Sequence, residues 1–364
     1  MISFQPTEDQ KLVIETIQRF VKERVQRIRH EADENRTLPA EVINEGWSLG
    51  LLAGWVPEEF GGLGESHSAV GGALYAEELA YGDLSLALTL LAPSLVGLPV
   101  LEFGTPEQKA KWLPRLTEDK FPALTAALSE PGWNFDPNAP GTLAVLEDEE
   151  YILNGQKVLV PLAAEAEVIL VYAFEAGKTQ AFLVEKGTPG LIIGEREKNM
   201  GLQALPTYEI KLDNCHLPLS ARLGGEAGCD AQKLLNYSRV GLSALAVGVA
   251  RAALDYAQAY AKERQAFGRA IAQFQSIAFM IAEMSIEVDA ARLMAWEAAW
   301  TLDQGQDALK ESVLAKNYAD EMSLTVTDRS VQILGGHGYI REHPVEGFLR
   351  NARAFAVAPG LAMV

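Results

Sequence analysis

The first third of the chain shows the hydrophobic spacing of amphipathic helices. Apolar side chains recur at intervals of three and four, as one face of a helix requires; they are Val13, Ile17, Phe20, Val21, Val25 and Ile28. Thr7 and Gln10 in front of them form the pattern of a capping box. Further helices are expected after Leu38 and across Ala69–Tyr81. The pattern predicts a helical domain over residues 1–120.

The pattern changes to short, strand-like runs over residues 121–226. Tyr151–Leu153 and Gln156–Val160 are two such runs, and the dipeptide Asn154-Gly155 lies between them. Because Asn-Gly is the preferred sequence of a two-residue hairpin turn, a tight turn is expected there. We therefore predict a middle antiparallel β domain.

Helical periodicity returns after Cys229. Leu234–Ala261, Phe274–Leu302 and Ala308–Leu334 each carry an apolar stripe, and each is long enough to cross a bundle. A four-helix-type bundle is expected over residues 227–364. The chain as a whole is predicted to be an α+β multidomain protein in which helices, a β domain and a bundle follow one another.

Composition narrows the classes of partner. The 364 residues include 31 Lys and Arg against 49 Asp and Glu, a net charge of −18, and 48% of residues are hydrophobic. That apolar content excludes an intrinsically disordered chain. The acidic excess argues against nucleic acid and anionic membrane surfaces, because both would repel the protein. A small anionic ligand needs only a few well-placed basic residues.

Cysteines and apolar runs add further expectations. Cys215 and Cys229 have neither a CxxC spacing nor neighbouring histidines, so no metal site and no disulfide framework are expected. Pro93 and Pro99 interrupt the longest uncharged run, Leu84–Val100, which is predicted to be buried helix and turn rather than a membrane span. The first residues lack the regions of a signal peptide, so a cytoplasmic location is expected.

Five motifs follow one another along nearly the whole chain. They are VPEEFGGLG at 56–64, LSEPG at 128–132, NGQK at 154–157, ERQAFG at 263–268 with FQ and AEM after it, and QILGGHGY at 332–339. A single motif is weak, since Gly335-Gly336 alone is compatible with a helix C-cap. All five in this order resemble the acyl-CoA dehydrogenases, flavoenzymes that oxidise the α,β bond of a fatty acyl thioester.

The resemblance implies FAD as the cofactor, in a site assembled from two subunits of an oligomer. One chain surrounds the isoalloxazine ring, and its neighbour holds the adenosine diphosphate. The positions that match the adenosine-diphosphate half are intact; they are Arg264, Phe267, Gln275, Gln332, Gly335 and Gly336. Arg264 offers a planar fork that suits a pyrophosphate. The alternative for Arg264 is a surface ion pair with Glu263 or another nearby acid.

The half that would hold the ring departs from the family pattern. Ser129 keeps a hydroxyl, but Trp133 and Phe135 replace small residues of the signature. The two aromatic rings either fill the space of flavin or acyl chain, or sit on a rearranged loop beside an intact site. Pro161 stands where the family has a Thr, and it has neither the hydroxyl nor the backbone N–H of that residue.

The position of the catalytic base departs most. The family removes the α proton with a glutamate of a Tyr-Glu-Gly-Thr motif. The resemblance places Pro359 there, and proline has no titratable group and no N–H to polarise the thioester carbonyl. Some relatives carry the glutamate just before an arginine of the first bundle helix. That position is Ser238, followed by Arg239, which is a candidate for binding acyl-CoA.

Other carboxylates, such as Glu130 and Asp136, would reach the site only by coincidence of folding. Relatives also continue past this motif into another helix, so the bundle is expected to be short and to lack its final helix. His337 and His343 are interpreted as packing or capping residues.

These observations favour a degenerate subunit that contributes the adenosine-diphosphate half of a partner's FAD site. The alternative is an active FAD-dependent acyl-CoA dehydrogenase with a displaced base, and a third possibility is an oligomeric scaffold that keeps only the fold. The expected partners are further copies of this chain in a homo-oligomer, or another subunit of the family in a hetero-oligomer.

Overall fold

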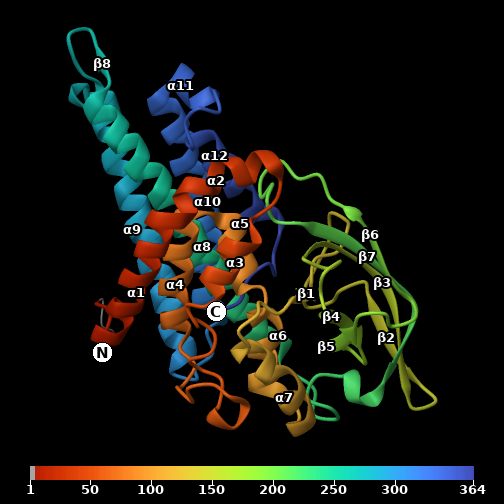
Figure 1. The fold of residues 1–364 in the computed structure, drawn as a ribbon. Helices are drawn as coiled ribbons and strands as arrows, with labels where there is room; N and C mark the ends of the chain where they lie inside the picture. The colour runs from red at the N-terminus through yellow and green to blue at the C-terminus, as the bar shows by residue number, and fades with distance from the viewer. Residues whose placement is uncertain (1–4) are drawn as a thin grey trace.

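The N-terminal helices lie between a C-terminal helical bundle and a sheet (Figure 1). A computed structural model describes residues 5–364. The first four residues belong to the segment that lacks the pattern of a signal peptide, and they lie outside the described residues. The N-terminal elements are α1 (Glu8–Phe20), a π-helical turn (Val21–Val25), α2 (Gln26–Asn35), α3 (Ala40–Trp47), α4 (Ala69–Gly82), α5 (Leu84–Leu91), α6 (Ser94–Phe103) and α7 (Pro106–Trp112).

The expected start of the first helix is confirmed. The Thr7 hydroxyl accepts a hydrogen bond from the Gln10 N–H at 3.2 Å, and the Gln10 side chain accepts one from the Thr7 N–H at 2.9 Å. Two donors that the helix leaves without a partner are satisfied in this way.

The middle of the chain forms one seven-stranded sheet. Its strands are β1 (Leu124–Ala127), β2 (Leu143–Glu147), β3 (Glu150–Pro161), β4 (Val168–Glu175), β5 (Lys178–Glu185), β6 (Leu191–Arg196) and β7 (Thr207–Pro218). The order is β1-β4-β2-β3-β7-β6, with β5 beside β4. The pairings are antiparallel except that β4 runs parallel to β1 and β2. The sheet is therefore mixed, although mostly antiparallel as predicted.

The predicted hairpin at Asn154-Gly155 is wrong. Both residues lie inside β3, where Gly155 pairs with Leu212 of β7 next to a bulge. The turn comes earlier, at Asp148 and Glu149, which have positive φ angles of 47° and 66°. A Cβ at residue 155 would lie 2.6 Å from the Cα of Thr142. The absence of a side chain at residue 155 therefore allows the backbone at Thr142 to pack closely, and it is not needed for a turn.

Gly155→Ala tests this explanation. We expect a loss of about 1–3 kcal/mol in the free energy of unfolding, because the added methyl group must push the 142 backbone away. Gly71→Ala in α4 is the control, since its Cβ would meet neighbours at an ordinary 3.6 Å. Urea unfolding of both variants measures the difference, and equal midpoints would contradict the explanation.

The bundle consists of α8 (Ala231–Glu263), α9 (Gln275–Asp303), α10 (Leu309–Leu334), α11 (Gly336–Tyr339) and α12 (Val345–Val357). The order of helical domain, β domain and bundle is thus as predicted. Two stretches, Leu84–Phe103 and α8, are apolar and long enough to cross a membrane. In the apolar 18-residue window of each stretch, 94% and 83% are buried inside the protein, as in the core helices of a folded domain.

An ion network joins the N-terminal helices to the bundle. Arg251 of α8 contacts Glu77 and Glu78 of α4, each at 2.7 Å. Arg292 of α9 also contacts Glu77, at 3.1 Å. The two glutamate side chains are only 5% and 10% exposed. Three helices from distant parts of the chain thus share one buried cluster of charges.

Candidate functional site

The residues that match the adenosine-diphosphate half gather at one end of the bundle, where Figure 1 labels β8 and α11. Arg264 ends α8, and a short hairpin follows, formed by β8 (Gln265–Ala266) and β9 (Arg269–Ala270). Phe267 and Gly268 make the turn with φ angles of 53° and 82°. The Phe267 ring is 96% exposed.

The Arg264 side chain is available to a ligand. It is exposed, and within residues 5–364 it forms no ion pair, so the expected alternative of a surface pair with Glu263 is not realised. Its backbone closes the hairpin: the Arg264 N–H donates to Tyr260, and the Ile271 N–H donates to Arg264, both at 2.8 Å. Gln275 is the exposed first residue of α9.

The other members of this half stand at the end of α10. Gln332 is exposed in the last turn, and its carbonyl accepts a hydrogen bond from the Gly335 N–H at 3.1 Å. Gly335 has φ 57° and ψ −131°, a conformation that only glycine adopts readily. Gly336, also exposed, begins α11. The backbone at this helix end is therefore open to close approach.

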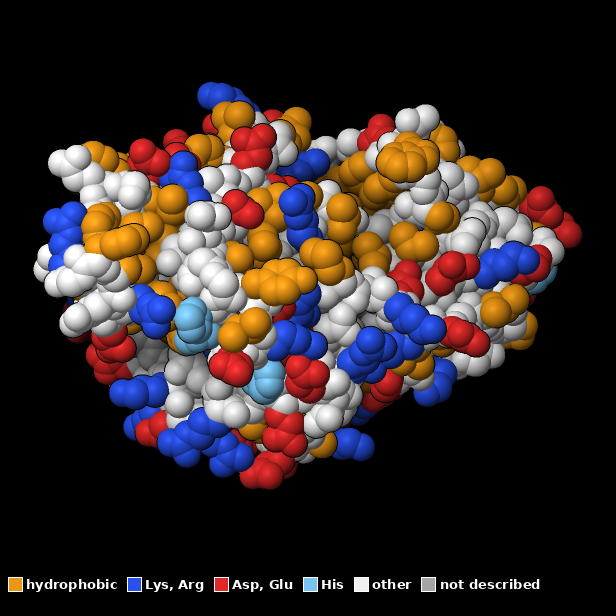
Figure 2. All heavy atoms as spheres, turned by 90° about the horizontal axis from the view of Figure 1, so that it is seen from above, with side chains coloured by type: hydrophobic (Ala, Val, Ile, Leu, Met, Phe, Trp, Pro, Cys, Tyr) orange, Lys and Arg blue, Asp and Glu red, His pale blue; other side chains and the backbone are white. Residues whose placement is uncertain are grey.

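A group of aromatic and histidine side chains connects the two helix ends. The rings of Tyr260 and His337 are 6.1 Å apart, and His337 lies 5.7 Å from His343. His343 Nδ1 and the Tyr256 hydroxyl share a hydrogen bond of 2.8 Å. The structure thus places both histidines in packing contacts. Figure 2 shows this end of the molecule from above, with basic and hydrophobic side chains among the acidic ones.

The residues that match the ring half lie elsewhere, where β1, β3 and the end of α12 meet. The Ser129 hydroxyl donates to the carbonyl oxygen of Pro359 at 2.8 Å. The Ser129 carbonyl accepts from the Val158 N–H at 2.9 Å. Ser129 is buried, and its hydroxyl proton is therefore engaged by the chain itself.

A buried ion pair fixes the loop after Ser129. The fully buried Lys157 donates to Glu130 at 2.8 Å and to the Leu128 carbonyl at 3.1 Å. Burial lowers the pKa of Lys157 to about 8, against the opposing effect of Glu130. Burial by itself would raise the pKa of Glu130. The charge of Lys157 and the hydrogen bonds from Lys157 and Thr142 have the larger, opposite effect, so the pKa of Glu130 lies below its usual value. Neither partner was singled out for this role by the sequence.

The Glu130 side chain joins the start of its loop to the end of the same loop. The Glu130 carboxylate accepts from the N–H groups of Gly141 and Thr142 at 2.6 and 2.8 Å. Trp133 in this loop is fully exposed in the single chain, so its ring does not pack into the interior of the protein. Phe135 is half-buried against the helical core. The alternative, a rearranged loop, agrees with this arrangement.

The segment around Pro161 is distorted. Leu159 and Leu162 both have φ of 56°, a left-handed conformation that is costly for branched side chains. The Leu159 N–H donates to Glu197 at 3.2 Å, while the other Glu197 oxygen is buried without a partner. No sequence pattern indicated Glu197.

The alternative base positions do not offer a free carboxylate. Ser238 is buried in α8, and Arg239 donates to Asn236 at 2.8 Å. Burial lowers the pKa of the Arg239 guanidinium. The Glu130 carboxylate is engaged as described, and Asp136 caps the nearby Asn138 N–H at 2.9 Å.

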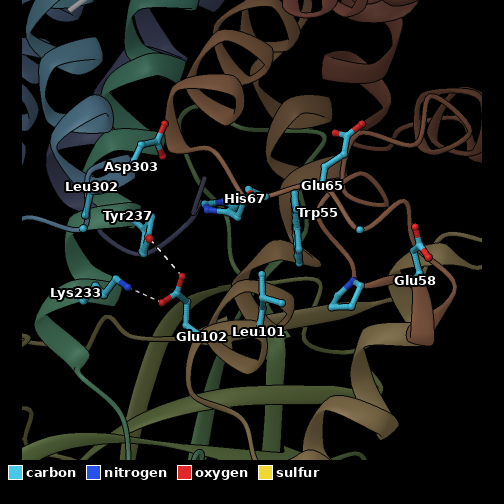
Figure 3. A pocket seen from close by; sticks show the side chains of 14 residues that line it. Trp55, Glu58, Glu65, His67, Leu101, Glu102, Lys233, Tyr237, Leu302 and Asp303 are labelled. Carbon is cyan, nitrogen blue, oxygen red and sulfur yellow. Dashed lines mark hydrogen bonds and ion pairs between the residues drawn. The ribbon is translucent and has the colours of Figure 1, made fainter. Parts of the chain in front are cut away.

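The cavity shown in Figure 3 has a volume of about 630 Å³, and none of these predicted residues lines it. Lys233 and the Tyr237 hydroxyl both contact Glu102, at 2.5 and 3.4 Å. His67 stands between the rings of Trp55 and Tyr237, and burial lowers its pKa. Residues 5–364 contain no group of three or more His, Cys, Asp or Glu arranged to hold a metal.

Comparison with known proteins decides the family. Family models for acyl-CoA dehydrogenases match residues 7–120 as the N-terminal domain, 125–215 as the middle domain and 229–362 as the C-terminal domain. The chain belongs to the acyl-CoA dehydrogenase family. It is 34% identical over 372 residues to the human mitochondrial short-chain specific acyl-CoA dehydrogenase, covering 100% of this chain and 89% of that one.

Two further comparisons also extend over nearly all of this acyl-CoA dehydrogenase family member. CarC, a subunit of the caffeyl-CoA reductase–Etf complex of Acetobacterium woodii, is 35% identical, and the alignment covers 98% of this chain and 96% of CarC. The structure of the FAD complex of PigA is similar with a TM-score of 0.88 and 30% identity, covering 99% of this chain and 96% of PigA.

Proposed function

We propose that this acyl-CoA dehydrogenase relative is a non-catalytic subunit, which supplies the adenosine-diphosphate half of an FAD site to a catalytic partner chain. The observation that carries the proposal is the contrast between the two halves. Arg264 is exposed and unpaired at the end of the bundle, whereas the ring half is closed by the chain's own bond from Ser129 to Pro359.

The residues of the two halves differ in their fit to FAD. The bundle end offers a free guanidinium, exposed amides and an open glycine backbone, which suit a pyrophosphate. The ring half does not fit the isoalloxazine, because Pro161 has no N–H and the Ser129 hydroxyl is already engaged. When bound, FAD would act as the acceptor of the hydride from the acyl thioester. No side chain at position 359 takes up the α proton, since proline does not titrate.

A hetero-oligomer agrees with this division of roles. The relative CarC is named as a subunit of a complex, and a role as one subunit among several suits this chain too. The second candidate function is an active dehydrogenase of acyl-CoA with a displaced base. The exposed position of Trp133 favours it, because that ring takes up no space in the interior.

Spectra and masses of purified protein distinguish the two functions. We expect the chain alone to be colourless, and we expect co-expression with a neighbouring dehydrogenase subunit to give a yellow mixed complex, identified by its intact mass. A chain that is yellow alone and is bleached by an acyl-CoA would establish the second function. Failure to form a mixed complex with any such subunit would contradict the proposal.

Arg264→Ala tests the half-site within the mixed complex. A hydrogen bond to a charged group contributes about 1.5–3 kcal/mol, so FAD affinity should fall roughly ten- to hundred-fold. Arg269→Ala in the same hairpin is the control, because Arg269 stacks on Phe274 at 4.1 Å. Flavin retained during dialysis measures the affinity of each variant. Equal loss from both variants would show that the hairpin as a whole, rather than Arg264, holds the cofactor.

A further inference from the structure

The chain turns into the interior of the protein after α12. We call residues 359–364 the inner segment; in Figure 1 the label C lies among the helices. Its last four residues, Leu361, Ala362, Met363 and Val364, are each no more than 5% exposed and belong to the helical core. A stretch without regular structure therefore occupies a place that apolar side chains usually fill.

Polar groups hold the inner segment at both ends. Ser129 donates to the Pro359 carbonyl at 2.8 Å, and Ser94 donates to the Met363 carbonyl at 2.6 Å. Ser94 begins α6 and is itself buried. Because a buried carbonyl without a partner is costly, these two hydroxyls make it possible for the backbone to enter an apolar region.

Glycines on two helices leave the room that the segment occupies. A Cβ at Gly72 of α4 would lie 2.8 Å from the Cβ of Val364, and one at Gly241 of α8 would lie 3.3 Å from a Val364 methyl group. Gly360 turns the chain inward with φ 82°, and a Cβ there would lie 2.7 Å from Leu128. Any larger residue on either helix would reduce this space.

The space continues beyond the inner segment. A cavity of about 290 Å³ has an apolar side, lined by Met363 and Val364 together with Leu52, Leu91 and Leu98, and a polar side that includes Asp9, Glu65 and Ser68. Trp55 and His67 line both this cavity and the larger one of Figure 3. The inner segment thus fills one part of a chamber between α4, α5, α6 and α8, which is apolar around the segment and becomes polar toward Glu65 and the cavity of Figure 3.

We propose that the inner segment is the resident occupant of this chamber, and that an acyl chain binds there only when residues 361–364 leave. The segment starts at position 359, where the family resemblance places the residue that meets the α carbon. An acyl chain attached at that carbon would extend into the same space. Residues 361–364 are apolar, as an acyl chain is, and they are buried in this space, so the segment and an acyl chain cannot occupy it together.

Displacement has a clear physical cost. Leu361, Met363 and Val364 would move from the core into water, and the Ser94 hydroxyl would lose one of its two acceptors and keep only the Leu91 carbonyl. The inner segment therefore competes with an acyl ligand. The inference does not depend on whether FAD is shared with a partner, since it concerns only the interior of this chain.

Binding of octanoyl-CoA, an eight-carbon acyl thioester, tests the proposal by calorimetry. A chain shortened to end at Gly360 should bind octanoyl-CoA at least ten-fold more tightly than the full chain. Ser94→Ala, which removes one anchor but keeps the apolar packing, should give a smaller increase. Free CoA is the control ligand and should bind all three chains alike. Equal affinity of the full and shortened chains for octanoyl-CoA, or no binding by either, would overturn the proposal.

Hydrogen exchange on the full chain keeps the test independent of how well the shortened chain folds. Amides of residues 361–364 should exchange slowly in the free protein and faster when octanoyl-CoA is saturating. Unchanged exchange at saturation would show that the ligand binds without displacing the segment and would overturn the proposal. Neither measurement involves flavin or a partner subunit, so the results are separate from those on the proposed function.

Discussion

Lys157→Met is expected to lower the free energy of unfolding by about 3–5 kcal/mol, because it leaves the Glu130 carboxylate without its cation in a site with little water. The lysine side chain is fully buried, and the glutamate side chain is 11% exposed. The remaining partners of Glu130 are two backbone N–H groups, which do not balance its charge. Chemical denaturation of the purified variant measures the loss.

Two variants accompany this prediction. Lys211→Met removes an exposed pair with Asp213 on the neighbouring strand β7 and should change stability by less than about 1 kcal/mol. The double variant Lys157→Met with Glu130→Gln should recover much of the loss, because no unpaired charge remains. A single variant as stable as the Lys211→Met control would contradict the interpretation of the pair.

Alkaline pH gives an independent test of the buried lysine. The pKa of Lys157 is about 8 in the folded protein and near its ordinary 10.5 in the unfolded chain. Between these values the unfolded chain binds more protons, so the contribution of Lys157 to stability becomes more favourable as pH rises from 8 to 10.5. Below pH 8 both states are protonated, and the contribution is constant. The difference between the native chain and Lys157→Met should follow this course.

Arg251→Met is the second change with a large expected effect, a loss of about 3–5 kcal/mol. Arg251 is the partner of Glu78 in α4 and one of two partners of Glu77. Without it, the Glu78 side chain, which is 10% exposed, has no cationic partner, and α4 loses its ionic link to α8. Thermal and urea unfolding should both show the destabilisation.

The matched control is Arg329→Met, which removes a pair with Glu283 between α10 and α9. This pair is partly exposed, with side-chain exposures of 32% and 59%, so its loss should cost less than about 1 kcal/mol. An equal loss in the free energy of unfolding for both arginine variants would contradict the prediction, because it would show that burial of the network does not increase the cost of breaking it.

Local signals in the sequence predicted the helices well. The Thr7–Gln10 capping box and the spacing that follows it depend on residues within one or two turns of each other, and the helix forms there. The order of the three regions could be predicted because the spacing of hydrophobic residues changes from helical to strand-like and back to helical along the chain. These features require no knowledge of distant contacts.

Features that depend on distant contacts could not be predicted. Gly155 resembles a turn residue locally, but Thr142, which packs against it, decides its conformation. Lys157 and Glu130 are 27 residues apart, and no pattern connects them. The apolar residues at 361–364 do not show by themselves that they lie between α4 and α8. The sequence indicated where the candidate site departs from the family, but not what occupies the space.

Strand β1 has a consequence for how the protein unfolds. It follows the N-terminal helices directly, yet it pairs in parallel with β4, more than 40 residues later, from Leu124 opposite Val168 onward. Leu124 and Ala126 belong to the helical core, whereas Ala127 belongs to the core of the sheet. Removal of this four-residue strand would open both cores at once. The N-terminal helices and the sheet are therefore coupled into one cooperative unit, although their sequences look like separate domains.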